Sequence, residues 1–279
     1  MAGKLTVVPT PIGNLGDITQ RATDALRAAD VVFCEDTRRS GLLLHHLGVE
    51  RQMRSLFLGN ERERSAEALA MIAEGHSVAL ISDAGTPAIS DPGAGLIADV
   101  IAAGYALEVL PGPQAILPAL LLSGLPPAPF SFIGFLPRRG TARRGALSDL
   151  VPIPWTLVLY EAPHRLQDLL EDALTVLGDR PAAVVREISK LHEETVRGTI
   201  SMLLEAFAAR EVRGEIVVVV SGRPQEATPI DNLEDFVREA LARGLSPKEV
   251  AGEARARGIK HRDAYREALR QGKGPLSKR

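Results

Sequence analysis

The chain has 279 residues, of which 45% are hydrophobic and 24% charged, and its formal net charge is -2. This length can bury a sizeable core and favours two domains or more, while the near-zero charge names no class of partner. A single cysteine, Cys34, excludes a disulfide framework, and the N-terminus lacks an apolar stretch long enough for a signal peptide, so we expect a cytoplasmic protein.

Strands and helices alternate over residues 1–112, which predicts an N-terminal αβ domain with a parallel sheet. The domain opens with the apolar strand Leu5–Val8 and a helix over residues 20–29. Further strand and helix pairs follow at residues 31–48, 55–73 and 78–101, and a last strand lies at residues 107–110.

A loop rich in small residues and proline occupies residues 82–93 and has the sequence SDAGTPAISDPG. It follows the apolar strand Val78–Ile81, which is typical of a strand buried in a parallel sheet, and it precedes a helix that begins near Ala94. The loop is therefore expected at the carboxyl edge of the sheet, where open αβ sheets bind ligands. Small residues allow backbone to approach a bound molecule, so we predict a small-molecule site here. An ordinary turn-rich connection is the alternative.

Residues 113–222 are predicted to form a second αβ domain, with a mixed rather than a purely parallel sheet. No charged residue occurs between Glu108 and Arg138, but six prolines interrupt this segment, which favours a buried strand-helix-strand over a transmembrane helix. After the strand at residues 130–136 comes a basic loop without a nearby acid in the sequence. Phosphate contact suits such cations, and a solvated face is the alternative. The cations are Arg138, Arg139, Arg143 and Arg144.

Residues 223–230 have the composition of a linker, and residues 231–279 are predicted to form a basic helical domain. Three short helices broken at Gly244 and Gly258 resemble a helix-turn-helix. Residues 255–279 contain nine Lys or Arg against two acids. Arg262 and Arg266 are four residues apart, so one helix face is cationic and suited to an RNA surface; a charged, partly frayed extension is the alternative.

Common cofactor motifs are absent or out of context. Gly93–Ala98 fits the pattern G-x-G-x-x-A, but a dinucleotide fingerprint needs its first glycine at the strand end, and here the long loop intervenes. The sequence has no P-loop motif, no G-x-S-x-G motif and no cysteine and histidine cluster with metal-ligand spacing. We expect no metal.

Seven motifs occur in order along the chain: TPIGNLGDIT at 10–19, EDTR at 35–38, the 82–93 loop, PGP at 111–113, GFLPR at 134–138, YEAPHR at 160–165 and REISKLHEE at 186–194. Together they resemble the ribosomal RNA small subunit methyltransferase I family of the tetrapyrrole methylase superfamily. The resemblance implies two αβ domains with S-adenosylmethionine in a cleft between them and a homodimer. It also implies 2'-O-methylation of a decoding-centre cytidine in 16S rRNA, either free or in the assembled small ribosomal subunit. Gln114 departs from the small residue expected after Pro-Gly-Pro.

The resemblance also implies a set of site residues. A ribose hydroxyl is a weak acid, so a general base would help, and the resemblance places the loops of four candidates around the cleft. Those candidates are Glu35, Asp36, Glu187 and Lys190. The implied cofactor contacts are Pro11, Asp83, Gly85, Thr86, Ala88, Ile89, Ser90, Ala115, Tyr160 and Arg186. The expected RNA contacts are Arg38, Arg138, Arg139, Arg143, Arg144, Arg262 and Arg266.

Several alternatives stay open at this point. Glu35 and Asp36 with Arg38 can instead form a surface ion pair and helix cap, and Glu187 and Lys190 can simply pair with each other. Asp91 and Asp83 can favour a cationic sulfonium, while amides of the loop can hold a carboxylate. A methylase of a small tetrapyrrole-type molecule, or a non-catalytic nucleic-acid-binding regulator, remains a competing function.

Overall fold

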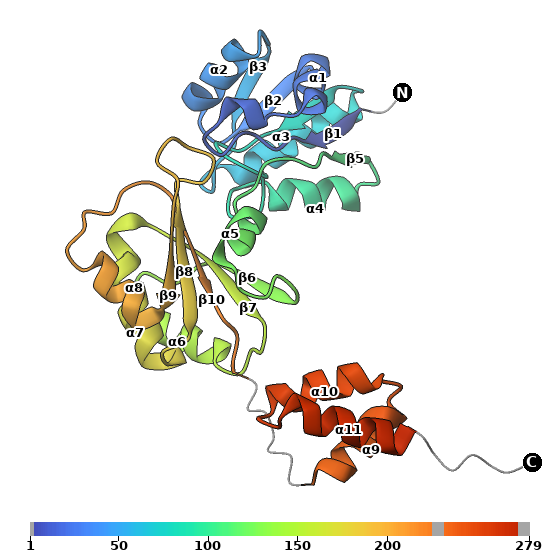
Figure 1. The fold of residues 1–279 in the computed structure, drawn as a ribbon. Coiled ribbons are helices and arrows are strands. Elements are labelled where there is room, and N and C mark those ends of the chain that lie inside the picture. The colour runs from blue at the N-terminus through green and yellow to red at the C-terminus, as the bar shows by residue number, and fades with distance from the viewer. Residues whose placement is uncertain (1–2, 225–231, 273–279) are drawn as a thin grey trace, which may run out of the picture. The chain divides into compact units, whose positions relative to one another are not determined.

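In the computed structural model, which describes residues 3–224 and 232–272, the chain divides into two units, residues 1–223 and 224–279 (Figure 1). The first unit contains two separate sheets, and the second contains only helices. The boundary predicted at residue 112 stays a prediction. Most of the predicted linker, residues 225–230, lies outside the described residues, as do residues 273–279. No helix in the described ranges is long and apolar enough to cross a membrane.

The first sheet is parallel throughout, with strand order β3-β2-β4-β1-β5, as the alternating pattern predicted. Its central strands are apolar and covered on both faces: Val31 and Phe33 pack in one core cluster, and Val32 and Cys34 pack in another. The strands are β1 (Lys4–Val7), β2 (Val31–Cys34), β3 (Gln52–Ser55), β4 (Ser77–Leu80) and β5 (Ala106–Val109). The helices are α1 (Gln20–Ala28), α2 (Thr37–His46), α3 (Glu61–Ala73) and α4 (Ala94–Ala102), with a 3-10 turn at Leu15–Asp17.

The loop between β4 and α4 lies at the carboxyl edge of this sheet, as predicted. Glu61 on α3 holds its end, because one carboxylate oxygen accepts hydrogen bonds from the amides of Gly93 (2.9 Å) and Gly95 (3.2 Å). Gly93 has a φ of +119°, and a Cβ added there would lie 2.7 Å from Leu80. Only glycine therefore suits the turn into α4.

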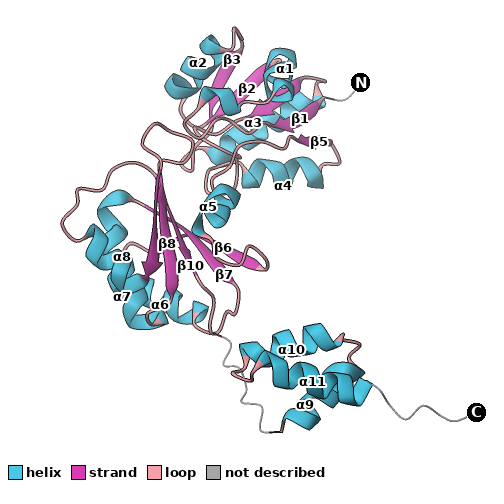
Figure 2. Cartoon of the chain, viewed as in Figure 1, coloured by secondary structure: helices cyan, strands magenta, loops and turns pink. Residues whose placement is uncertain are grey.

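The second sheet is mixed, with strand order β6-β7-β10-β8-β9; β6 and β7 are parallel and the other neighbours antiparallel. Three helices cover one face of this sheet and α5 packs on the other (Figure 2). The strands are β6 (Phe130–Phe135), β7 (Thr156–Glu161), β8 (Pro181–Arg186), β9 (Glu194–Thr199) and β10 (Ile216–Val220). The helices are α5 (Ile116–Ser123), α6 (Gly140–Leu150), α7 (Leu166–Leu177) and α8 (Ile200–Phe207), with a 3-10 turn at Pro163–Arg165.

The basic segment after β6 differs from the prediction. It is not a loop throughout, because α6 begins at Gly140 and carries both Arg143 and Arg144. Leu147 is fully buried in the core of the second sheet and anchors this helix. Only Arg138 and Arg139 precede the helix.

The second unit contains the three predicted helices, α9 (Leu233–Ala242), α10 (Pro247–Ala256) and α11 (His261–Gly272). Ser246 caps α10 in a capping box with Glu249, which satisfies amides that the first helical turn leaves without partners. Small residues fill the core between the helices, including Ala254, Ala264 and Ala268, which are fully buried.

Candidate active site

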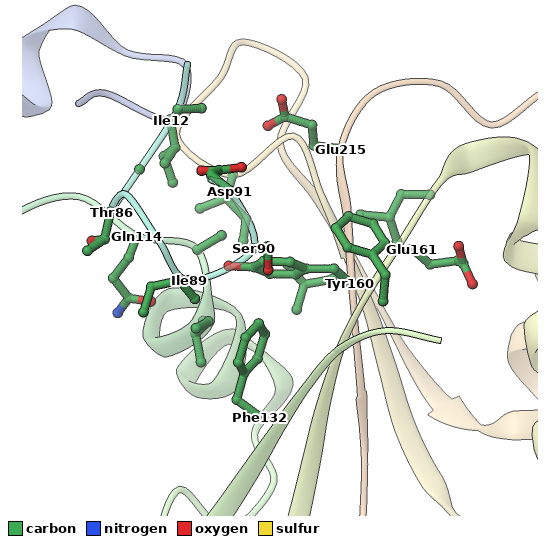
Figure 3. Close-up of a pocket in the computed structure, with 18 of the residues that line it drawn as sticks. Ile12, Thr86, Ile89, Ser90, Asp91, Gln114, Phe132, Tyr160, Glu161 and Glu215 are labelled. Atoms are coloured by element: carbon green, nitrogen blue, oxygen red, sulfur yellow. The ribbon is translucent and has the colours of Figure 1, made fainter. Parts of the chain in front are cut away.

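A pocket of about 660 Å³ in the first unit is lined by loops that follow strands of the first sheet, by α5, and by strands and loops of the second sheet (Figure 3). Ile89 and Asp91 of the 82–93 loop form one side, and Phe132 and Tyr160 of the second sheet form the other. The lining residues are Ile12, Ala84, Gly85, Thr86, Ile89, Ser90, Asp91, Gln114, Ala115, Ile116, Leu117, Phe130, Phe132, Phe135, Tyr160, Glu161, Ala162, Pro163, Ile188, Gly214, Glu215, Ile216 and Val217.

Three loops from the N-terminal part of the chain meet at one side of the pocket. Thr10 and Gly85 exchange backbone hydrogen bonds of 2.9 Å, and the Thr86 hydroxyl donates to the Pro113 carbonyl at 3.2 Å. Gly85 has a φ of +80°, and an added Cβ would lie 3.3 Å from Ile12. The backbone at Gly85 thus leaves room for a ligand that a side chain would occupy.

Several predicted cofactor residues line this pocket and others do not. Asp83 accepts a hydrogen bond from the Asp36 amide (3.1 Å) and pairs with Arg39 (3.3 Å). Arg186 pairs with Glu194 at 2.5 Å, so its charge is committed outside the pocket. The predicted residues in the lining are Gly85, Thr86, Ile89, Ser90, Ala115 and Tyr160, and those outside it are Pro11, Asp83, Ala88 and Arg186.

Glu187 and Lys190 form an ion pair of 2.9 Å outside the pocket lining. Burial acts to raise the pKa of Glu187, but hydrogen bonds from Lys190 and from the Glu215 amide leave that pKa lowered. Burial acts to lower the pKa of Lys190, but Glu187 and Glu215 leave it raised. A lysine held protonated cannot accept a proton, and a stabilised carboxylate is a weaker base. The mutual pairing left open by the sequence is therefore what the structure contains.

Glu35 and Asp36 also lie outside the pocket lining. Asp36 caps α2 through the Arg38 amide and forms a two-pronged ion pair with the Arg38 side chain, which lowers the pKa of Asp36 to about 2. Burial raises the pKa of Glu35, and the charges of Asp91 and Asp83 raise it further. Asp36 and Arg38 thus form the surface ion pair and helix cap that the sequence left open.

Asp91 was not among the predicted bases, although this residue lines the pocket. Burial raises its pKa, and the negative charges of Asp83 and Glu215 raise it further. Glu161 also lines the pocket, but its carboxylate points to the other side of the strand from Tyr160 (Figure 3). The position of Asp91 in a loop already singled out was the available signal.

The chain matches the family described as Tetrapyrrole (Corrin/Porphyrin) Methylases over residues 4–204. It is 42% identical to Ribosomal RNA small subunit methyltransferase I of Escherichia coli O157:H7, covering 96% of each chain. It is 39% identical to the protein of that name from Halalkalibacterium halodurans, covering 94% of this chain and 93% of that one. The chain belongs to the tetrapyrrole methylase family. Membership confirms the expected enzyme class, a methyltransferase dependent on S-adenosylmethionine.

Two solved structures have the same fold at low sequence identity. Uroporphyrin-III-C-methyltransferase from Thermus thermophilus is 22% identical, with a TM-score of 0.56, and the match covers 80% of this chain and 93% of that one. A diphthine synthase is 16% identical, with a TM-score of 0.61, covering 78% and 90%. The predicted fold of a tetrapyrrole methylase with two αβ domains and C-terminal helices is confirmed.

The pocket fits the cofactor of this methyltransferase family. Its volume is within the range of small-molecule sites. The backbone at Gly85 leaves a space that a Cβ would fill, and the Asp91 carboxylate can favour a positively charged sulfur. The Gln114 side chain accepts a hydrogen bond from the Leu117 amide (3.1 Å), so this departure from the family motif binds the first turn of α5.

The basic residues expected to bind RNA fall into two groups in this family member. Arg143 is buried, with 5% of its side chain exposed, and its Nε donates to Asp172 at 2.6 Å. Arg144 also pairs with Asp172, at 2.9 Å. The expectation that no acid lies nearby was wrong, because α7 brings Asp172 to α6, and Arg143 cannot reach RNA. The exposed residues of the set are Arg38, Arg138, Arg139, Arg144, Arg262 and Arg266.

Proposed function

We propose that the chain transfers a methyl group from S-adenosylmethionine to the ribose 2'-oxygen of a decoding-centre cytidine in 16S rRNA. The observation that carries the proposal is the identity of about 40%, over almost the whole chain, with relatives named Ribosomal RNA small subunit methyltransferase I. The choice of cytidine and of the 2'-oxygen is what the family resemblance carried by the seven sequence motifs implies. We propose that the chain acts in the cytoplasm, on free rRNA or on the small subunit.

The chain's own residues would position the reactants for this transfer. The bound cofactor supplies an electrophilic methyl group on a positively charged sulfur. We propose that Gly85, Thr86 and Ala115 hold it against the three joined loops, with Tyr160 on the opposite wall. Since methyl transfer is an in-line displacement, alignment of the acceptor oxygen with the methyl carbon accounts for much of the rate.

Asp91 is our proposed proton acceptor, in preference to the four residues first considered. Its carboxylate lines the pocket, and a raised pKa makes it a stronger base than an ordinary aspartate. Negative charge at the same position also favours a cationic sulfur. Glu35, Asp36, Glu187 and Lys190 stay candidates only if an RNA complex moves their side chains into the pocket.

The test is transfer of labelled methyl groups to small subunits from a strain that lacks the activity, followed by nucleoside mapping. One 2'-O-methylcytidine at the decoding centre is the expected product. Cofactor binding without incorporation into subunits or free 16S rRNA would contradict the proposal and favour a small tetrapyrrole-type substrate. We also propose a homodimer, as the motifs imply, which light scattering of the purified protein would test.

A further inference from the structure

An irregularity in β6 brings an extra aromatic residue to the pocket. Phe132 pairs with Val158, but the next pairs are Gly134 with Leu159 and Phe135 with Tyr160, so Ile133 is an inserted residue. Ile133 packs on the face of the sheet that α6, α7 and α8 cover. Phe130 and Phe132 lie on the opposite face, which borders the pocket. In a regular strand Phe135 would share the face of Ile133. The bulge instead makes Phe135 part of the pocket lining.

Phe135 is more than half exposed although it is a large aromatic residue. Its ring lies against Tyr160, with centroids 5.6 Å apart, yet 56% of the residue remains accessible. Tyr160 is itself held edge-on by Phe132, with centroids 4.9 Å apart. The Phe135 ring thus packs against Tyr160, which Phe132 supports in turn, and much of the Phe135 surface faces solvent.

The backbone after Phe135 is held by the half-buried Arg165. Arg165 donates hydrogen bonds to the carbonyls of Leu136 (2.8 Å) and Pro137 (3.2 Å). Arg165 in turn pairs with Glu161 at 3.2 Å, and their side chains are 14% and 0% exposed. The YEAPHR and GFLPR motifs therefore act as one structural unit that fixes the position of Phe135.

Two exposed cations follow on the same segment. Arg138 and Arg139 make no side-chain hydrogen bond or ion pair within the described ranges, 3–224 and 232–272. This differs from Arg143 and Arg144, which both pair with Asp172. An accessible aromatic ring, followed three and four residues later by exposed guanidinium groups, is a combination suited to single-stranded nucleic acid, through base stacking and phosphate contacts.

We propose that Phe135 stacks on an unpaired base of the RNA substrate, next to the cofactor pocket, with Arg138 and Arg139 contacting the adjoining phosphates. The inference rests on the proposed function and adds how the substrate is held. The adenine of the cofactor is the other ring that could stack there. The two adjacent cations favour RNA, because S-adenosylmethionine carries no phosphate.

The test compares full-length Phe135→Ala with wild type. We expect the KM for small subunits, and the Kd for a single-stranded RNA oligonucleotide, to rise by roughly 5- to 150-fold, the range for loss of one stacked base. Phe135→Trp should restore most of both values. The Kd for S-adenosylmethionine should not change in either variant.

Trp155→Ala is the matched control. Trp155 is also an exposed aromatic, 46% accessible, and it lies at the opposite end of the neighbouring strand β7. It should leave both RNA values unchanged. A Phe135→Ala enzyme with unchanged RNA affinity would overturn the inference, and so would an equal loss of cofactor affinity. If wild type binds the single strand through Phe135 but methylates no subunits, the proposed function fails while the stacking contact stands.

Discussion

Thr10 and Gly85 exchange a pair of backbone hydrogen bonds, each 2.9 Å long, at the carboxyl edge of the first sheet. This short antiparallel bridge joins the loop after β1 to the loop after β4. The Thr10 hydroxyl adds a third bond, to the Ser82 carbonyl at 3.0 Å. At Gly85 the pocket wall is therefore held by backbone hydrogen bonds, which side-chain changes elsewhere would disturb little.

Replacing Gly85 should weaken cofactor binding more than replacing any polar residue of the pocket lining. Gly85→Val would combine a φ of +80° with a clash toward Ile12, and such strain costs about 1–3 kcal/mol. We expect a lower melting temperature and loss of S-adenosylmethionine binding by calorimetry. Gly145→Ala on α6 is the control, because nothing lies within 4 Å of its added Cβ. Normal cofactor binding by Gly85→Val would contradict the backbone cradle.

Asp91→Asn should reduce kcat by roughly 100- to 10,000-fold if Asp91 takes the proton. Activity of the wild type should fall as pH drops through the raised pKa of Asp91, at a higher pH than for an ordinary aspartate. The folded state binds the Asp91 proton more tightly than the unfolded state does. The free energy of unfolding therefore falls as pH rises through the raised pKa of Asp91, where its carboxylate becomes charged. The variant should therefore melt at a higher temperature at pH 8. Exposed Asp99→Asn is the control, and full activity of Asp91→Asn would exclude the proposed role.

Arg143→Met should lower stability rather than RNA affinity. Removing one partner of a buried ion pair costs at most about 3–5 kcal/mol; Asp172 would lose its 2.6 Å partner but keep Arg144 at 2.9 Å, so we expect a loss below this range. In contrast, Arg138→Ala with Arg139→Ala should leave the melting temperature unchanged and weaken RNA binding. The slope of the logarithm of the RNA binding constant against the logarithm of salt concentration should become shallower by roughly 0.7–0.9 per lost phosphate contact. An Arg143→Met protein of normal stability with weakened RNA binding would return Arg143 to the RNA surface.

Glu187 and Lys190 should act on stability and not on the chemical step. A cycle of Glu187→Gln, Lys190→Met and the double variant should give a coupling of about 1 kcal/mol at pH 7, with kcat little changed. Since the pKa of Glu187 is lowered, this coupling is present above its ordinary value of 4.5 and is lost as pH falls through the lowered value. Urea unfolding at pH 7 and pH 3 measures it. A large fall in kcat without loss of stability would restore them as catalytic candidates.

The sequence predicted the parallel sheet and the ligand loop because both depend on local chemistry. Buried strands such as β2 are apolar at every position, and the 82–93 loop is rich in small residues. It did not predict α6, because Gly140 and Gly145 are poor helix formers and the helix start has no side-chain cap. Arg143 was misread as exposed because its partner, Asp172, lies 29 residues away.

Tyr160 was predicted at the pocket, but the phenylalanines of β6 beside it were overlooked, for a different reason. Alternation of facing in a strand can be counted only when the strand is regular, and the insertion at Ile133 breaks the count. Gly134, inside an otherwise apolar strand and at a φ of +73°, was the one local indication of a bulge. The choice of proton acceptor could not be made either, because it depends on which carboxylates face the pocket.

The bulge at Ile133 also constrains how this strand can change in length. Deleting Ile133 would remove the inserted residue and leave the pairs that follow, Gly134 with Leu159 and Phe135 with Tyr160, in place. Phe135 would stay at the pocket, and Leu136, now 5% exposed, would stay in the core. If Ile133 were kept and paired with Leu159 instead, every later residue would change face, so that Phe135 would turn toward the core and Leu136 toward solvent. The bulge is thus the one place where β6 can lose a residue without turning the aromatic ring away from the pocket mouth.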